Sequence, residues 1–327
     1  MIKKEIAHGG FASLVKRALE LGIKVKFYPG RFSLVKFYLG EDVIFSRMGI
    51  IPLSVHPARL VVNKDLTKTI LGLMDIRTPK GIVASSYGEA INLIRKEKIK
   101  YPFIAKPIDG TCAKGVTWNV RSKKELKTAV RLINSREIRK WLRSDKFLIE
   151  EMYIGDEYRV LVFDGEVISC VKKIPATIVG DGISTIQELV NIFNKKRKKG
   201  FEIKIDKVAK KTLSKNNLTL NSILIKNTKL KLRDNLNMSD GGRAIESTNK
   251  MSAFLKKTCV KSIQASGLSW GGVDLMTNNL SSKKNYVILE INSNPFYNMS
   301  ESPLVEGAGI DVSGKILKNL FPKLKIK

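Results

Sequence analysis

The sequence predicts an α+β protein in which amphipathic helices alternate with short strands. Apolar residues recur at helical spacing in segments distributed along the whole chain. Short apolar segments lie between them, and turn sequences such as Asp164-Gly165 join neighbouring segments into hairpins. With 327 residues, 43% of them hydrophobic, the chain is long enough to bury a sizeable core.

The first 60 residues are predicted to form a small α/β unit. Residues 11–21 have helical spacing, and Gly22 is the expected C-cap. Strands are expected at 23–28, 33–39 and 42–45, and Gly40-Glu41 separates the last two.

The middle of the chain alternates between helices and strands. Thr78-Pro79 is expected to break the helix that precedes it. Helices are predicted at 63–74, 89–98 and 123 to about 142, and strands at 82–84, 103–106, 116–120, 147–150 and 158–163.

The last part of the chain contains a polar, Lys-rich stretch between more regular elements. Residues 200–230 are predicted to be weakly structured with one short helix. Helices are predicted at 185–199, 252–266 and 312–320, and strands at 273–276 and 286–291.

Composition limits the class of protein. The 59 Lys and Arg against 30 Asp and Glu give a formal charge of +29, which would attract polyanions. The Lys residues are scattered and no nucleic-acid-reading motif accompanies them, so specific nucleic-acid binding is not expected. No run of about 18 apolar residues occurs, which predicts a cytoplasmic protein with no membrane partner. Cys112, Cys170 and Cys259 are odd in number and widely spaced, so we expect reduced thiols.

Three oxygen-bearing side chains are candidates for a metal site. Glu290 and Asn292 are two residues apart in the strand segment VILEINSNP, so both project from one face. Asp274, in GGVDLM, can lie opposite them on the preceding strand. Two carboxylates and an amide form the all-oxygen set that Mg²⁺ prefers when it also binds substrate phosphates. Such residues alone are more often ordinary strand surface, so the other motifs decide.

Two further motifs suit a nucleotide. Lys106 ends an apolar strand in FIAKPIDGTCAKGV, where a flexible loop that contains Gly110 and Gly115 lets backbone N–H groups approach phosphate oxygens. Glu150 and Glu157 bracket a linker between two strands, where carboxylates can accept from an adenine amino group and ribose hydroxyls. A plain turn and two exposed acids are the alternative interpretations.

Taken together, these segments resemble the ATP-grasp superfamily, in particular the ATP-grasp portion of cyanophycin synthetase and the glutathione-forming half of bifunctional glutathione synthetase. IPATIVGDGISTIQELV and LRDNLNMSDGGRAIEST carry much of the likeness, which covers nearly the whole chain. The resemblance implies an ATP-grasp fold with a nucleotide cleft between two α+β lobes. It implies a pre-ATP-grasp region at 1–85, a small lobe at 86–152, and a large lobe with the metal site at 153–327.

The resemblance also implies roles for individual residues. Two lysines and a mobile loop would face the phosphates, a carboxylate and the hinge backbone would meet the adenine, and two arginines would lie near the phosphates or the acyl group. The implied cofactor-binding residues are Lys64, Lys106, Gly110, Lys114, Gly115, Glu150, Glu151, Tyr153 and Glu157, the metal ligands are Asp274, Glu290 and Asn292, and the catalytic residues are Lys106, Arg159 and Arg233. Asn63 and Lys173 depart from the family pattern, because relatives usually have Asp and Arg at these positions.

The implied activity is that of an ATP-dependent carboxylate–amine ligase that forms an amide or peptide bond through an acyl phosphate. Its cofactors would be ATP and Mg²⁺, with Mn²⁺ as a substitute, and its substrates would be small molecules or peptides. A homo-oligomer is one expected assembly. Other ATP-dependent phosphoryl transfer, a regulatory ATP-binding module and a polyanion-binding role are the alternatives, and the sequence does not identify the acid or the amine.

Overall fold

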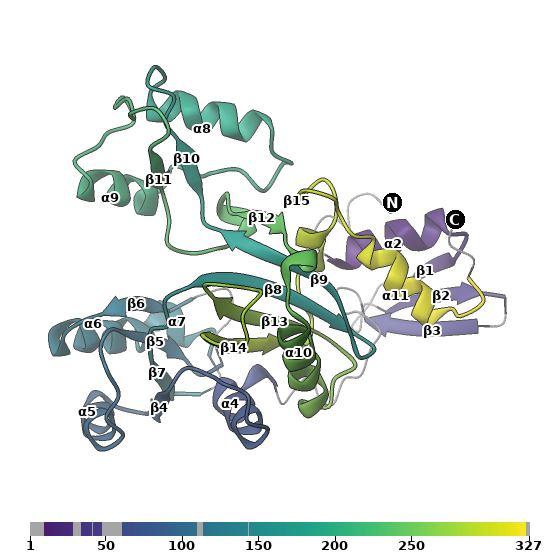
Figure 1. Ribbon diagram of the computed structural model, residues 1–327, viewed down its shortest axis with the longest axis horizontal. Coiled ribbons are helices and arrows are strands. Elements are labelled where there is room, and N and C mark those ends of the chain that lie inside the picture. Colours follow the sequence, from purple (N-terminus) through teal and green to yellow (C-terminus); the bar gives the residue numbers. More distant parts are fainter. Residues whose placement is uncertain are drawn as a thin grey trace. The chain divides into compact units, whose positions relative to one another are not determined.

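The computed structural model describes residues 10–28, 34–40, 42–47, 61–109, 114–142 and 144–324. The chain divides into two compact units, each assembled from separate stretches of sequence. The first unit comprises Met1–Gly49, Ser169–Thr248 and Phe296–Lys327, and the second comprises Ile50–Ile168 and Asn249–Pro295. Figure 1 shows the elements of both. None of the helices in the described ranges is long and apolar enough to cross a bilayer.

A four-stranded antiparallel sheet lies in the second unit. Its strand order is β4-β7-β5-β6, and its strands are β4 (Gly81–Ala84), β5 (Phe103–Pro107), β6 (Thr117–Val120) and β7 (Phe147–Glu151). The helices α5 (Tyr87–Lys96) and α6 (Lys123–Ile133) begin after Ser86 and Ser122, whose side chains cap them by accepting a backbone N–H.

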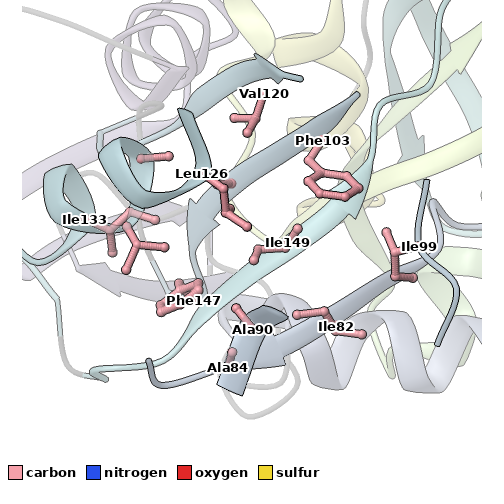
Figure 2. Close-up of a cluster of buried hydrophobic side chains, with 13 residues drawn as sticks. Ile82, Ala84, Ala90, Ile99, Phe103, Val120, Leu126, Ile133, Phe147 and Ile149 are labelled. Carbon is pink, nitrogen blue, oxygen red and sulfur yellow. The ribbon is translucent and has the colours of Figure 1, made fainter. Parts of the chain in front are cut away.

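The core of this part of the unit lies between the sheet and its two helices. Leu126 and Ile133 lie seven residues apart on α6, so both face the same side of the helix. Figure 2 shows them with Phe147 and Ile149 of β7 in one buried cluster. Because β7 is a central strand of the sheet, Glu150, which follows the buried residues 147–149, is itself buried.

The helix predicted from 123 to about 142 is wrong in its length. α6 ends at Ile133, and α7 (Arg136–Arg139) is a separate short helix. Ser135 between them has an extended backbone, with ψ at 150°. Asn134 and Ser135 are residue types that compete with the helix for backbone hydrogen bonds, which explains the break. The apolar spacing continues past it, so periodicity did not reveal the interruption.

A second antiparallel group of strands completes this unit. Its order is β14-β13-β8, made of β8 (Asp156–Phe163), β13 (Trp270–Thr277) and β14 (Tyr286–Asn292). The helix α10 (Ala253–Ala265) packs on β13 and β8, and α4 (Lys64–Leu73) packs on β14. The predicted turn at Asp164-Gly165 is confirmed, since both residues have positive φ, at 47° and 79°, as a type I′ turn requires.

The first unit begins with the predicted small α/β arrangement. The helix α2 (Gly10–Glu20) precedes an antiparallel sheet of β1 (Lys24–Tyr28), β2 (Leu34–Leu39) and β3 (Asp42–Arg47). Gly22 follows α2 with φ at 78°, as expected of a C-cap glycine. The unit also contains β9 (Glu166–Ile174) from Ser169 onward, β12 (Arg243–Glu246), β15 (Val305–Glu306), α11 (Val312–Leu320) and the 3₁₀ turns Met238–Asp240 and Tyr297–Ser300. A further 3₁₀ turn, Thr248–Lys250, begins at the last residue of the stretch Ser169–Thr248 and continues into the second unit.

A separate hydrophobic cluster in the first unit spans residues 176–232. It contains β10 (Thr177–Val179), α8 (Ile186–Lys195), α9 (Lys207–Lys215) and β11 (Lys229–Lys231), which lie together in Figure 1. The one short helix predicted for 200–230 is confirmed as α9, but the expectation of weak structure is wrong, because Ile203, Leu224 and Leu230 are buried. These apolar residues follow neither helical nor strand spacing, so no pattern marked them as core.

Candidate active site

Two carboxylates face each other across β13 and β14 in the second unit. Asp274 pairs in register with Glu290, and Gly272 pairs with Asn292. Directly opposite residues of antiparallel strands point to the same face, so the three polar side chains converge. The amide Nδ2 of Asn292 lies 3.4 Å from Asp274 Oδ2 and 3.4 Å from Glu290 Oε1. The structure therefore brings the three predicted metal ligands together.

Arg159 extends this row onto a third strand. It pairs in register with Asp274, and its Nε and Nη2 donate to Asp274 Oδ1 at 2.6 Å and Oδ2 at 3.1 Å. Both residues are buried, with exposed fractions of 8% and 4%. Burial by itself lowers the pKa of Arg159, but Asp274 outweighs it, and the pKa is raised. The guanidinium thus stays charged and keeps Asp274 oriented.

A glycine makes room for this arginine. A Cβ atom on Gly272 would lie 2.9 Å from Arg159 Cδ and 2.7 Å from Pro295 Cβ, closer than real Cβ contacts. Sequence reasoning missed this residue. The signal was present in the Gly-Gly pair directly before Val273-Asp274, because a glycine two residues before a site residue lies on the same face.

The first predicted phosphate-binding lysine begins α4. Asn63 caps the helix, and its Oδ1 accepts from the backbone N–H groups of Asp65 at 3.0 Å and Leu66 at 3.2 Å. Asn63 therefore caps the helix as the expected Asp would, because both side chains accept backbone N–H groups at an N-cap. Lys64 Nζ lies 4.0 Å from Glu290 Oε2. Burial lowers the pKa of Lys64, while Glu290 acts in the opposite direction.

Glu290 carries the opposite perturbation. Desolvation raises the pKa of its carboxyl group, and the negative charge of Asp274 raises it further. Lys64 and Lys106 oppose this shift. Two facing carboxylates of this kind favour a cation between them, because the cation offsets their mutual repulsion.

The second predicted lysine lies on β5 beside a fully buried carboxylate. Lys106 Nζ contacts Glu150 Oε1, and Lys68 Nζ lies 2.6 Å from Glu150 Oε2. Burial alone would raise the pKa of Glu150, but Lys106 and Lys68 outweigh it, and the pKa is lowered. Sequence reasoning missed Lys68, although its position four residues after Lys64 places both on one face of α4.

The predicted adenine-binding hinge follows β7. The backbone N–H groups of Glu151 and Met152 donate to Lys80 O at 2.8 Å and to Pro102 O at 2.9 Å. The Glu151 carboxylate accepts from the Lys100 N–H at 2.8 Å. These groups are thus paired within the unit, and the adenine role of Glu150, of the hinge and of Tyr153 stays a prediction.

Glu157, the predicted ribose contact, lies on the site-facing side of β8. It precedes Arg159 by two residues, so both project from the same face of the strand. It is partly buried and pairs in register with Met276. Its position is therefore compatible with the ribose role, which stays a prediction.

Only part of the predicted phosphate loop falls within the described residues. Gly110 lies outside them. Lys114 Nζ lies 3.7 Å from the centre of the Trp141 ring, a cation–π contact. Gly115 has φ at 72°, and a Cβ there would lie 2.9 Å from Ile138 Cγ2, so this position requires glycine. The phosphate role of Lys114 and Gly115 stays a prediction.

Arg233 belongs to the first unit and is not among the residues that the second unit brings together. It is buried, and its Nη2 lies 2.7 Å from Asp206 Oδ2 and donates to Lys204 O at 3.1 Å. Asp206 also caps α9. In this unit Arg233 therefore has a structural partner, and its catalytic role stays a prediction.

Two family models match the chain. Residues 69–231 match the family described as "Prokaryotic glutathione synthetase, ATP-grasp domain". Residues 222–320 match the family described as "RimK-like ATP-grasp domain". The two matches together run from α4 to α11 and include both strands that carry Asp274 and Glu290.

Curated relatives are similar over most of the chain. A cyanophycin synthetase of Trichormus variabilis is 30% identical over 329 residues, which cover 95% of this chain and 34% of that protein. A bifunctional glutathione biosynthesis protein of Streptococcus agalactiae is 32% identical over 289 residues, which cover 84% of this chain and 36% of that protein. The chain thus spans about a third of the length of these relatives.

A solved structure shows a similar fold. The bifunctional glutathione synthetase of Pasteurella multocida superposes with a TM-score of 0.72 at 22% identity, over 98% of this chain and 45% of that protein. The predicted α+β fold of the ATP-grasp type is confirmed by this similarity and by the family matches.

Proposed function

We propose that this chain, which belongs to the ATP-grasp superfamily, uses ATP to join a carboxylate to an amine through an acyl phosphate. The observation that carries the proposal is the row of Arg159, Asp274 and Glu290 on three adjacent strands, with Lys64 next to Glu290. This row combines a cation-binding pair of carboxylates with positive groups suited to phosphate oxygens.

The donor set fits magnesium bound together with a nucleotide. Asp274 and Glu290 supply carboxylate oxygens, and Asn292 would present its amide oxygen to the ion. Throughout the described ranges no group of three or more His, Cys, Asp or Glu side chains could hold a metal by itself. Two carboxylates and an amide suit Mg²⁺, which retains waters and substrate phosphate oxygens as its other ligands. When bound, the ion would offset charge on the terminal phosphates of ATP.

The proposed reaction has two steps. An oxygen of the substrate carboxylate attacks the γ-phosphorus of ATP, the bond to the β-phosphate oxygen breaks, and ADP leaves. The amine then attacks the acyl carbon, phosphate leaves with the bonding pair, and the amine loses a proton. Lys64 and Lys106 would stabilise the phosphates in the first step, and Arg159 would stabilise the developing oxyanion in the second. Substrate and product need no covalent bond to the protein.

The decisive experiment replaces a proposed metal ligand. Glu290→Ala should abolish ADP release from ATP and Mg²⁺ in the presence of an acid and an amine, with the thermal unfolding temperature close to that of the wild type. Glu166→Ala, which removes an exposed carboxylate on β9, is the matched control and should retain full turnover. Turnover by Glu290→Ala at the wild-type rate would contradict the proposal.

The substrates are found by pairing amino acids and dipeptides in an ADP-release screen with mass detection of the product. A ligase requires both an acid and an amine for sustained release. Release that does not depend on the amine would indicate phosphoryl transfer instead, and ATP binding without turnover would indicate a regulatory module.

A further inference from the structure

Glu150 is a carboxylate without exposed surface, at 0%. Each of its oxygens faces an ammonium group, Lys106 at Oε1 and Lys68 at Oε2. In the part of the chain that the structure describes, these are the two cations that pair with it. A buried carboxylate that loses its counter-ions is strongly unfavourable, so at least one lysine must stay in place.

The two lysines are held differently. Lys68 Nζ donates to the backbone oxygen of Pro79 at 2.6 Å in addition to its contact with Glu150. It lies on α4, whose first turn is fixed by the Asn63 cap. Lys106 is the penultimate residue of β5 and has no second acceptor among the contacts of the described residues. Lys68 is therefore the anchored partner, and Lys106 can exchange its partner more readily.

We propose that Lys68 is a positioning residue: it remains the permanent counter-ion of Glu150, which allows Lys106 to turn its ammonium group toward the nucleotide phosphates. This inference rests on the proposed function, because it assumes that the site binds ATP. Without Lys68, the transfer of Lys106 to a phosphate would leave Glu150 buried and uncompensated. The free energy needed to separate Lys106 from Glu150 would then oppose nucleotide binding.

The test measures ATP binding by calorimetry and the steady-state KM for ATP in four variants. Lys68→Met should weaken ATP binding by roughly tenfold or more, because a buried charge pair loses one partner. Lys68→Arg should retain most of the affinity, because it keeps the charge. The double variant Lys68→Met/Glu150→Gln should recover much of the affinity, because a neutral amide needs no counter-ion and its oxygen still accepts a hydrogen bond from an adenine amino group. Lys261→Met is the control, since Lys261 donates to Met74 O at 2.8 Å at the other end of α4 and forms no ion pair with a carboxylate of the described residues.

The recovery in the double variant separates this role from direct contact with the nucleotide. Wild-type affinity in Lys68→Met, or a loss that Glu150→Gln does not restore, would overturn the proposal. If Lys68→Met does not fold, ATP affinity is compared between Glu150→Gln and the double variant Lys68→Met/Glu150→Gln. There, removal of Lys68 should change ATP affinity by less than about threefold, and a loss of about tenfold would overturn the proposal. A wild-type protein that does not bind ATP would instead overturn the proposed function itself.

Discussion

Gly272→Ala should disturb the row of charged residues without changing any charge. The added Cβ would lie 2.7 Å from Pro295 Cβ, 2.9 Å from Arg159 Cδ and 3.2 Å from Arg159 Nη1. Ordinary carbon contacts lie at about 3.5–4.0 Å, so the backbone of β13 or the arginine must shift by several tenths of an ångström or more. Overpacking of this kind costs about 1–3 kcal/mol. Because Arg159 holds Asp274 through two hydrogen bonds, the shift also moves a proposed metal ligand.

The assay combines thermal unfolding with ADP release. We expect a lower Tm and a rate reduced by roughly tenfold to hundredfold, because small displacements of catalytic groups have large kinetic effects. The matched control is Gly72→Ala in α4, where an added Cβ meets nothing within 4 Å. It should raise the stability by up to about 1 kcal/mol through helix propensity and leave the rate unchanged. Wild-type Tm and wild-type rate in Gly272→Ala would refute the reasoning.

Three further predictions follow from single features. Asn63→Ala should destabilise the protein by about 1 kcal/mol through loss of the α4 cap, while Asn63→Asp should not, as measured by thermal unfolding; equal effects would contradict the capping role. Removal of divalent cations with EDTA should stop ADP release, and Mg²⁺ or Mn²⁺ should restore it; full activity in EDTA would exclude the metal site. Hydrogen bonds from Ser184 and from backbone N–H groups lower the pKa of Asp181 from 3.8 to about 2, so its stabilising effect is complete above its ordinary pKa and is lost as the pH falls through about 2. NMR titration of this carboxyl group checks the value, which Ser184→Ala should raise, and an ordinary pKa in the wild type would contradict it.

The sequence predicted that the three proposed metal ligands lie together, because their placement depends on simple strand geometry. Glu290 and Asn292 have the two-residue spacing of one strand face, and Asp274 lies on the strand paired with theirs. β14 contains a register shift opposite Asp274 and Leu275, which alternation alone does not show. The prediction survived because Glu290 and Asn292 lie on the same side of that shift.

Other parts of the site depend on contacts between residues distant in the chain, which no local pattern records. The pairing of Lys68 with Glu150 joins helix α4 to strand β7, whereas the residue spacing showed only that Lys68 shares a helix face with Lys64. The buried residues of 200–230 were missed for a related reason. Several of their apolar side chains lie in irregular segments that pack against α8 and α9, where neither helical nor strand spacing applies. Predictions from spacing succeeded where neighbours in sequence were neighbours in the sheet.

The chain passes between its two compact units four times, so neither unit is a continuous piece of sequence. In the first unit α2, the first helix described, packs against α11, which is near the end of the chain. During synthesis on the ribosome, α2 therefore cannot pack against α11 until almost the whole chain has been made. A single protease cut at any of these four passages would divide the first unit into two pieces, and a cut at either of the two inner passages would divide the second unit as well.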